Sequence, residues 1–245
     1  MPHLSIVIPA YNEEKRLPRT LARTIPFLRE KGFAFEFVIV DDGSKDTTLE
    51  VVRELSQTYP EIRLISDGIN RGRGAAVKKG IAEARGDLIL ETDADGSVAD
   101  EAIARFVAKF DADPALDVIF GSRELPESHI VLWQPFLRVF LGYGFLFLAR
   151  AQFWMWSTTD FTLGFKMYRR EAAHDVFKHQ FDHFYVAEAE KVFVTKIRGH
   201  RFIELPVTWT DDPDSRVRPV RDTLRSLKGM ACILLRFMQG KYQNK

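Results

Sequence analysis

Cysteine is almost absent from this sequence. Cys232 is the only cysteine among 245 residues, which excludes an internal disulfide and a cysteine-based zinc site. Because a chain without disulfides suits a reducing compartment, we expect a cytoplasmic protein. An excess of one sign of charge is also missing, since 35 Lys and Arg face 34 Asp and Glu and leave a net charge of +1. Without a broad positive field, we expect no nucleic-acid partner.

Long uncharged hydrophobic runs are missing too. Residues 131–156 are rich in Phe, Leu and Trp, but Arg138 and Arg150 interrupt them. The longest uncharged stretch, 139–149, is shorter than the roughly 20 residues that a membrane-spanning helix needs. Residues 220–242 mix apolar and basic residues at helical spacing, which is typical of helices in a membrane interface. We therefore expect two interface helices, at 131–156 and 220–242, and peripheral attachment to the cytosolic face of a membrane. The first residues show no signal-peptide pattern, so we expect no secretion.

The sequence does contain an alternation of apolar strands and amphipathic helices. A hydrophobic content of 46% is enough for a core, and no linker or repeat divides residues 1–245, so we expect one domain. Strands are predicted at 4–8, 36–40, 62–66, 87–92, 117–120, 161–169 and 201–209, and helices at 44–59, through 84, from 170, around 188–190 and at 220–242. This alternation predicts an α/β fold with a mostly parallel central sheet flanked by helices.

A polar cluster follows each of three predicted strands, at 9–13, 41–44 and 93–97. Ligands of parallel sheets bind beyond the carboxyl ends of the strands, so we expect the clusters to converge on one site. Asp93 and Asp95, one residue apart, can offer hard oxygen ligands to Mg²⁺ or Mn²⁺, although an Asx turn is the alternative. Their neighbour Ser97 is either a third oxygen ligand or the N-cap of the next helix.

The first two clusters carry groups that suit a nucleotide. Tyr11 offers an aromatic wall, and Glu13 and Asp42 offer acceptors for base or ribose donors. Asp41 and Asp42 also suit a turn that caps the following helix, and we expect Asp42 to bind the ligand while Asp41 caps.

A glycine-rich turn lies at 70–74. Gly72 and Gly74 would allow close approach to a phosphate or base, with Arg71 and Arg73 as cations. An ordinary Asn-x-Gly turn explains the same residues equally well.

Taken in order, four motifs resemble those of the family 2 glycosyltransferases of GT-A fold. They are Pro9-Ala10-Tyr11-Asn12-Glu13, Val40-Asp41-Asp42-Gly43-Ser44, Asn70-Arg71-Gly72-Arg73-Gly74 and Asp93-Ala94-Asp95-Gly96. The later motifs Phe120-Gly121-Ser122-Arg123, Gly164-Phe165-Lys166 and Trp209-Thr210 are similar to the dolichyl-phosphate β-glucosyltransferase branch, a relative of the polyprenol-phosphate mannose synthases. The chain departs from that branch at 160–163 and at Glu188, where an Asp is usual.

The resemblance implies an inverting enzyme that moves one hexose from a nucleotide diphosphate sugar to a polyprenyl phosphate. UDP-glucose is the favoured donor, and GDP-mannose is the second candidate. The donor-binding residues implied are Pro9, Tyr11, Asn12, Glu13, Val40, Asp42, Arg73 and Asp93. The implied divalent metal ligands are Asp93 and Asp95, with Ser97 as a further ligand.

The nature of the acceptor decides whether a base is needed. A lipid phosphate is already an anion, so it needs cations to hold it rather than a group to deprotonate it. Arg123 and Arg138 match the acceptor-phosphate arginines of the mannose synthases, and a guanidinium can bind phosphate through two parallel bonds. With Asp93 and Asp95 they make up the expected catalytic set. Arg138 can also be interpreted as a snorkelling residue at a membrane edge.

The competing hypothesis is a soluble family 2 enzyme that uses a hydroxyl acceptor. Such an enzyme needs a general base, and Glu188 or Glu190 would supply it. A non-enzymatic sugar-nucleotide sensor is the third hypothesis, but it has no need of the paired Asp93 and Asp95.

Overall fold

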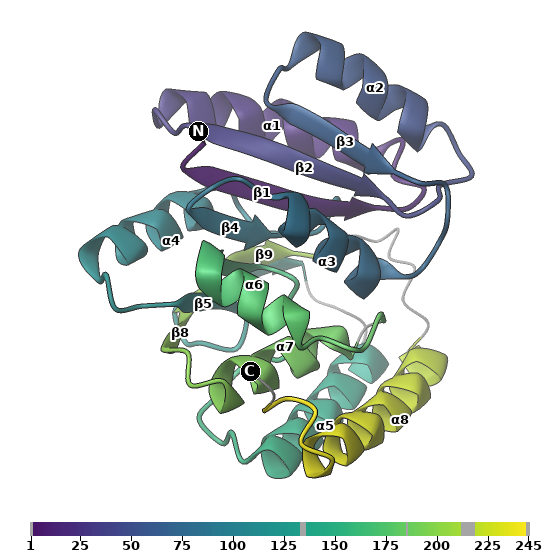
Figure 1. Ribbon diagram of the computed structural model, residues 1–245, viewed down its shortest axis with the longest axis vertical. Coiled ribbons are helices and arrows are strands. Elements are labelled where there is room, and N and C mark those ends of the chain that lie inside the picture. The colour runs from purple at the N-terminus through teal and green to yellow at the C-terminus, as the bar shows by residue number, and fades with distance from the viewer. Residues whose placement is uncertain (1, 133–135, 185, 212–218, 244–245) are drawn as a thin grey trace.

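The computed structural model describes residues 2–132, 136–184, 186–211 and 219–243 (Figure 1). The side chains of 136–138 and 219–224 lie outside the described part. The strands are β1 Leu4–Ala10, β2 Phe35–Asp41, β3 Ile62–Ser66, β4 Leu88–Glu91, β5 Val118–Ser122, β6 His129–Leu132, β7 Lys166–Arg169, β8 Phe202–Pro206 and β9 Thr208–Thr210. The helices are α1 Arg16–Glu30, α2 Thr48–Thr58, α3 Arg73–Glu83, α4 Glu101–Ala112, α5 Phe136–Phe153, α6 Arg170–Lys178, α7 Ala187–Ile197 and α8 Pro219–Met238.

The described strands form one large sheet and one small sheet. The large sheet has the order β3-β2-β1-β4-β7-β5-β8, and β6 pairs with β9 in the small one. Within the large sheet β7 runs antiparallel to β4 and β5, while the other neighbours are parallel. The prediction of an α/β fold with a mostly parallel sheet is confirmed.

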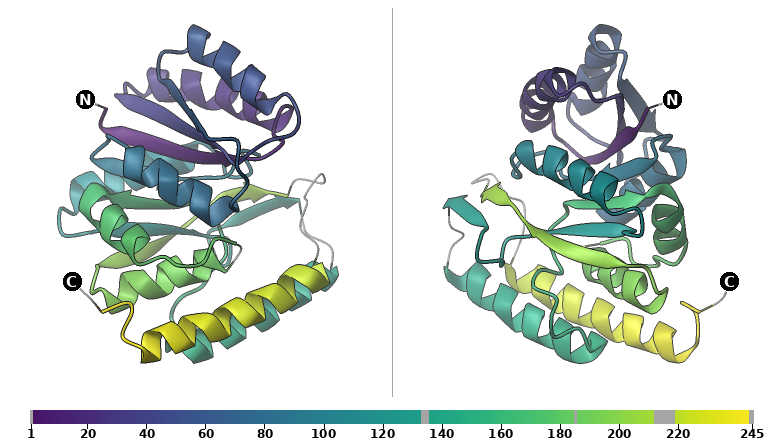
Figure 2. Two further views of the ribbon diagram at one scale, coloured as in Figure 1. Left: turned by 45° about the vertical axis from the view of Figure 1, so that its right-hand side comes forward. Right: turned by 90° about the vertical axis from the view of Figure 1, so that its left-hand side faces the viewer.

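Both faces of the sheet are covered by helices (Figure 2). In β1, Leu4, Ile6 and Ile8 pack into a core with α1, α2 and α4. Val7, between them, joins a second core with α3, α6 and α7. Since successive side chains of a strand point to opposite faces, a strand buried on both faces is mostly apolar, and the buried exception in β1, Ser5, donates its hydroxyl to Glu36 at 2.7 Å.

The polar clusters after β1, β2 and β4 lie at one edge of the sheet. Ala10 pairs with Asp41 at the ends of β1 and β2. The N–H of Thr92, just after β4, donates to the carbonyl of Val7 at 3.1 Å. The expected convergence therefore follows from parallel register, because all three strands end on the same side.

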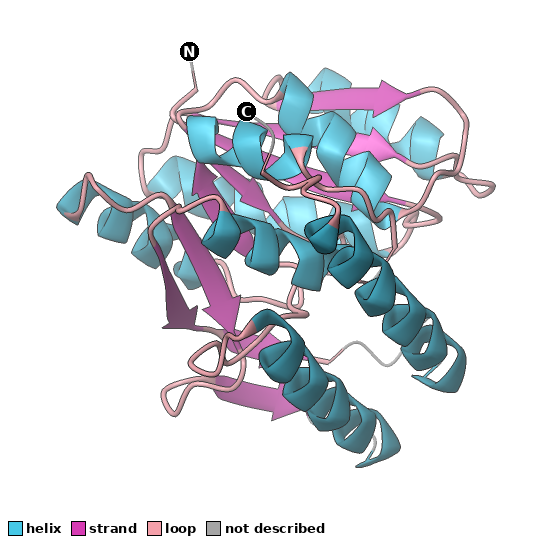
Figure 3. Ribbon diagram, turned by 60° about the horizontal axis from the view of Figure 1, so that its bottom comes forward, coloured by secondary structure: helices cyan, strands magenta, loops and turns pink. Residues whose placement is uncertain are grey.

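Helices α5 and α8 lie side by side beyond α7, at the bottom of Figure 1 (Figure 3). The predicted helix at 131–156 is shorter than expected, because residues 131–132 pair with β9 as part of β6. The predicted helix at 220–242 ends at Met238, and Gly240, with φ of +71°, turns the chain back. Among the described residues, no helix has the length and apolar character that crossing a membrane requires.

Three other predictions were wrong. The strand predicted at 201–209 divides into β8 and β9, which belong to different sheets. Strand β7 begins at Lys166 rather than at 161, because 160–163 form a turn whose N–H groups at Thr162 and Leu163 donate to the Asp160 carboxylate. Helix α2 begins at Thr48 rather than at 44. Asp46 accepts the Thr48 N–H at 3.0 Å and starts the helix four residues later than predicted.

Close packing of α3 on the sheet gives a test of the fold. A Cβ at Gly80 would lie 2.4 Å from Val7 Cγ1 and 2.9 Å from Val40 Cγ2. We therefore expect Gly80→Ala to lower the free energy of unfolding by about 1 to 3 kcal/mol. The matched control is Gly144→Ala in α5, where nothing lies within 4 Å. The control should be neutral or stabilising by up to about 1 kcal/mol. Urea denaturation measures both, and equal effects would contradict the packing of α3.

Candidate active site

The loop after β1 is joined to the loop after β2 by paired hydrogen bonds. Asn12 adopts a left-handed φ of +56°. Its N–H donates to Ser44 Oγ at 2.9 Å, and its side-chain Oδ1 accepts the Lys45 N–H at 2.7 Å. Asn tolerates this conformation better than most residues. Asn12, predicted to bind the donor, therefore shapes the loop that carries the neighbouring predicted residues.

Asp42 organises the glycine-rich loop at 70–74. Its two carboxylate oxygens accept the N–H groups of Arg71 at 2.8 Å and Gly72 at 2.9 Å. Burial raises the pKa of Asp42, and the two backbone donors oppose that rise. Asp41 accepts the Ser44 N–H at 3.1 Å and the Ser66 hydroxyl at 2.8 Å, so it closes the turn as predicted but does not cap α2.

The other predicted donor residues line the same edge. Pro9 lies near the end of β1, and Tyr11 follows it, half-buried. The Glu13 carboxylate is buried and pairs with Arg16, with one contact at 2.7 Å. Val40 faces the core under α3 with its side chain 2% exposed, which leaves its backbone for any contact with a ligand.

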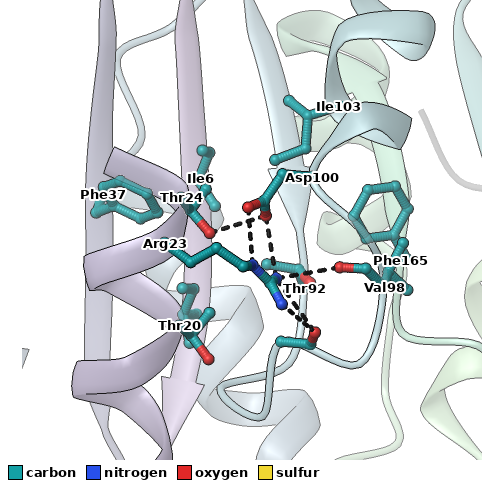
Figure 4. Close-up of a pocket in the computed structure, with 12 residues that line it drawn as sticks. Ile6, Thr20, Arg23, Thr24, Phe37, Thr92, Val98, Asp100, Ile103 and Phe165 are labelled. Atoms are coloured by element: carbon teal, nitrogen blue, oxygen red, sulfur yellow. Dashed lines mark hydrogen bonds and ion pairs between the residues drawn. The ribbon is translucent and has the colours of Figure 1, made fainter. Parts of the chain in front are cut away.

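Side chains of α1 hold the loop from Asp93 to Asp100 by hydrogen bonds (Figure 4). Arg23 donates from Nε to Asp100 at 2.8 Å and from its Nη atoms to the Gly96 carbonyl at 3.2 Å. Thr20 donates its hydroxyl to the Ala94 carbonyl at 2.8 Å. Gly96 has a φ of +63°, and a Cβ there would lie 2.7 Å from Thr20 Oγ1, so only glycine fits. A small cavity of about 20 Å³ lies between α1 and the loop.

The two carboxylates of this loop differ in their surroundings. Asp95 accepts the Ser97 N–H at 3.0 Å in an Asx turn. Asp93 accepts Arg73 Nε at 2.7 Å, and its partial removal from water raises its pKa while Arg73 opposes the rise. The alternative of Ser97 as an N-cap was wrong, because α4 begins four residues later at Glu101. Among the described residues, no group of three or more His, Cys, Asp and Glu gathers as a metal site.

A buried cluster of charges lies behind Asp93. Glu188 on α7 pairs with Lys166 Nζ at 2.6 Å, with Lys191 Nζ at 2.7 Å and with Arg73. Lys191 also pairs with Glu91 of β4, which accepts the Tyr168 hydroxyl at 2.9 Å. The Lys166 and Lys191 side chains are 1% and 0% exposed. The cluster therefore joins α3, β4, β7 and α7 through charged hydrogen bonds.

The charged residues around 188–190 predict a polar helix, and the structure of α7 corrects that prediction. Residues 187–195 are all buried, and their charged members are satisfied by partners rather than by water. Burial alone would raise the pKa of Glu188, but Lys166, Lys191 and Arg73 hold it well below its ordinary value. A carboxylate with so low a pKa is a poor acceptor for a proton.

Glu190, the other predicted base, is buried away from this cluster. One of its oxygens accepts the N–H groups of Phe181 at 3.0 Å and Asp182 at 2.7 Å. The other accepts the Tyr242 hydroxyl at 2.5 Å. Burial raises the pKa of Glu190. Both of its oxygens are thus occupied by protein donors.

Arg123 lies at the end of β5 and points to the same region as Asp93. It donates to Asp160 at 2.8 and 3.1 Å and to Thr162 Oγ1 at 2.6 Å, and its guanidinium stands 5.4 Å from the Trp209 ring centroid. Burial would lower the pKa of Arg123, but Asp160, and more weakly Asp93, raise it. The backbone of Arg138 lies in α5, but its side chain is outside the described residues.

Several residues of the site were missed by sequence analysis. Lys166 stands in the otherwise uncharged run 163–168, Lys191 comes directly before the apolar residues 192–194, and Glu91 ends the apolar strand β4. A charge in such a segment indicates a buried partner, and that signal was available. Arg23 had no comparable signal, since a basic residue on an amphipathic helix is ordinarily solvated.

The model of the family described as Glycosyl transferase family 2 matches residues 5–177. The chain belongs to this family. It is 34% identical to a dolichyl-phosphate beta-glucosyltransferase of Trichomonas vaginalis over 88% of this chain and 68% of that protein. The Dictyostelium discoideum protein of the same name is 33% identical over 99% of this chain and 77% of its own length. The human protein of the same name is 32% identical over 98% of this chain and 77% of its own length. The prediction of a family 2 glycosyltransferase is confirmed.

Solved structures support the fold. Glucosyl-3-phosphoglycerate synthase from Mycobacterium tuberculosis, in complex with UDP, matches 96% of this chain and 79% of its own, with a TM-score of 0.67 and 17% identity. The mannosyltransferase PcManGT from Pyrobaculum calidifontis, in complex with GDP-Man and Mn²⁺, matches 88% of this chain and 58% of its own, with a TM-score of 0.56 and 21% identity. The predicted GT-A fold is therefore confirmed.

The buried cluster gives a stability test with a pH signature. Glu188→Gln removes a charge that three cations share, so we expect a loss of about 3 to 5 kcal/mol at pH 7. The folded-state pKa of Glu188 lies below its unfolded value of about 4.3. Its contribution is therefore complete above that value and is lost as the pH falls below it. Denaturation at pH 7 and pH 4 should show the deficit of the variant shrinking at the lower pH.

The control for this test is the surface pair of Arg29 and Glu61, whose closest N and O atoms are 2.8 Å apart. Because Arg29 is half exposed, Glu61→Gln should cost only about 0 to 1 kcal/mol. If Glu188→Gln costs no more than this control at pH 7, Glu188 is not the centre of a buried cluster.

Proposed function

We propose that this enzyme transfers one glucose from UDP-glucose to a polyprenyl phosphate, such as dolichyl phosphate, at the cytosolic face of a membrane. The curated relatives named dolichyl-phosphate beta-glucosyltransferase support the choice of acceptor and sugar. We further propose that residues 1–245 act as one domain.

One observation carries the choice of a phosphate acceptor over a hydroxyl acceptor. Both glutamates that could act as a base have their oxygens committed, Glu188 to three cations and Glu190 to two N–H groups and a hydroxyl. A hydroxyl acceptor requires removal of a proton, whereas a phosphate oxygen already carries the charge. The hydroxyl-acceptor hypothesis therefore loses the two glutamates that it requires as candidate bases.

The donor residues make a site for a diphosphate and a divalent cation. Asp93 and Asp95 would hold Mg²⁺ or Mn²⁺, and two carboxylates suit a metal that keeps water and phosphate oxygens as its remaining ligands. Bound there, the cation would neutralise charge on the departing diphosphate. Ser97 remains a predicted further ligand. Arg73, whose Nε donates to Asp93 at 2.7 Å, would add a positive charge beside the diphosphate.

The transfer is a single displacement with inversion. An acceptor phosphate oxygen forms the new bond to the anomeric carbon of the glucose, while the bond from that carbon to the β-phosphate oxygen of UDP breaks and UDP leaves. Asp42 would fix the 70–74 loop against the nucleotide, with Pro9, Tyr11, Glu13 and Val40 as neighbours. Arg123 and Arg138 would hold the acceptor phosphate. No nucleophile of the protein enters this sequence.

Helices α5 and α8 supply a surface that suits the lipid. Large apolar side chains are exposed on both, namely Phe140, Tyr143, Phe147, Leu148, Leu227, Leu234, Leu235 and Met238. Arg225, Lys228, Arg236 and Lys241 lie in or just after α8. Exposed apolar groups beside basic ones are typical of a helix that lies in a membrane interface. This surface would bring a polyprenyl chain to the site while its phosphate reaches Arg123.

The cation requirement gives the first functional test. Asp95→Ala should lower glucose transfer by at least about 100-fold, because a Lewis acid at a departing diphosphate supplies several kcal/mol. It should also weaken Mn²⁺ binding, measured by electron paramagnetic resonance in the presence of UDP. Asp111→Ala, on the exposed surface of α4, is the control and should change neither value. Full activity in excess chelator would exclude the metal assignment.

The acceptor test compares polyprenyl phosphate with the matching polyprenol, using UDP-glucose as donor. We expect transfer only to the phosphate. Arg123→Ala should lower kcat/KM for the phosphate by about 30- to 1,000-fold, because it removes one of the two proposed acceptor cations and leaves Asp160 without its guanidinium partner. Arg123→Lys keeps the charge but loses the bidentate geometry, so its kcat/KM should lie between those of the wild type and Arg123→Ala. Glucosylated polyprenol from the wild-type enzyme would overturn the proposal.

A further inference from the structure

We propose that Tyr242 and Glu190 are positioning residues that hold the donor loop 70–74 in place through the segment 180–184. The proposal rests on the proposed function, since it assigns nucleotide binding to that loop. Neither residue touches the loop directly. Three consecutive layers of contacts connect them to it.

The first layer of contacts holds the Tyr242 side chain in the core. The chain turns at Gly240 after α8, and Tyr242 returns to the core with its side chain fully buried. Its hydroxyl donates to Glu190 Oε1 at 2.5 Å. Its ring contacts those of Phe181 and Phe193 edge-on, with centroids 5.5 and 5.9 Å apart. Arg236 Nη1 lies 3.4 Å from the same oxygen, so Tyr242 is the nearer of two groups that hold one oxygen of a carboxylate that is itself 0% exposed.

The second layer is Glu190. Its other oxygen accepts the N–H groups of Phe181 and Asp182 at 3.0 and 2.7 Å. A buried carboxylate with two backbone donors on one oxygen and a hydroxyl on the other has few other orientations open to it. Glu190 thus anchors a segment that has no helix or strand of its own.

The third layer joins this segment to the donor loop. The carbonyl of His183 accepts the Gly74 N–H at 2.9 Å, and Gln180 Nε2 donates to the Gly74 carbonyl at 3.2 Å. A Cβ at Gly72 would lie 2.6 Å from the His183 carbonyl oxygen. These contacts set the start of α3, whose first residue, Arg73, holds Asp93. The same segment thus supports the donor loop and the first residue of the metal pair.

Gln180, at the start of the segment, is buried and its carbonyl accepts Lys78 Nζ at 2.8 Å, but the two phenylalanines that follow are partly exposed. Phe181 and Phe184 are 38% and 40% exposed. Their outer neighbours come from α8, where the Arg225 guanidinium lies 3.2 Å from the Phe184 ring centroid and that of Arg236 lies 5.4 Å from the Phe181 centroid. The two rings are therefore only partly buried, which gives the segment less apolar packing than a core segment has. Loss of the Glu190 anchor should therefore loosen the segment and the loop behind it.

The test is Tyr242→Phe, which removes one hydroxyl and keeps the buried ring. UDP binding in the presence of Mn²⁺, measured by calorimetry without acceptor or membrane, should weaken by about 3- to 10-fold. Amide hydrogen exchange of residues 70–76 and 180–184 in the ligand-free protein should accelerate. A residue that only stabilises the fold would leave UDP affinity unchanged well below the melting temperature, so this affinity separates positioning from general stability.

The matched control is Tyr59→Phe, at the end of α2 on the opposite face of the sheet. It should change neither UDP affinity nor exchange at 70–76. Arg225→Ala, at an exposed position, provides a second variant that tests the same segment if Tyr242→Phe does not fold, and it should accelerate exchange at 180–184 and 70–76.

Unchanged exchange at 70–76 in the variants would overturn the inference. The proposed function fails separately, if the wild-type enzyme binds no UDP. In that case hydrogen exchange still decides whether Tyr242 positions the loop.

Discussion

The charge cluster around Glu188 is the interaction on which the site depends. Three cations, Arg73, Lys166 and Lys191, meet three carboxylates, Glu91, Asp93 and Glu188, in a region where most of their side chains are buried. Desolvating six charges is costly, and the cost is offset only if each charge keeps its partners. The four elements that supply them must therefore assume one relative position. That requirement fixes Asp93 against Arg73, and with it the geometry of the loop that follows β4.

The same requirement separates structural carboxylates from those at the ligand edge. Glu91 and Glu188 are buried, whereas the Asp93 side chain is 39% exposed. One oxygen of Asp93 thus pairs with Arg73 in the cluster, while the exposed part of the side chain faces the open edge of the sheet. A carboxylate shared in this way can be rigid and still reach a ligand, which is the arrangement that preorganised catalysis requires.

The placement of the site could be predicted from the sequence, but the use of its residues could not. Polar clusters after parallel strands must meet at one edge, so the convergence of Asn12, Asp42 and Asp93 followed from register alone. In the sequence Glu188 has the character of a candidate base, because its partner Lys166 lies 22 residues away and no local pattern shows which residue pairs with it. The roles of Asp42 and Asn12 as loop supports were hidden for a related reason, since their partners are backbone N–H groups that every residue type supplies.

Helices α5 and α8 are joined to the ligand edge of the sheet through packing on α7. In α8, Met230 and Ile233 are buried against the core while Leu234 and Leu235 are exposed, so one helix presents different faces to protein and solvent. Phe153 of α5 stacks on Phe193 of α7 with centroids 4.5 Å apart, and α7 carries Glu188. Close-packed interiors transmit displacement instead of absorbing it. A lipid surface that holds α5 and α8 would therefore also fix the distance between the acceptor phosphate and the donor edge, which a displacement between two bound substrates requires.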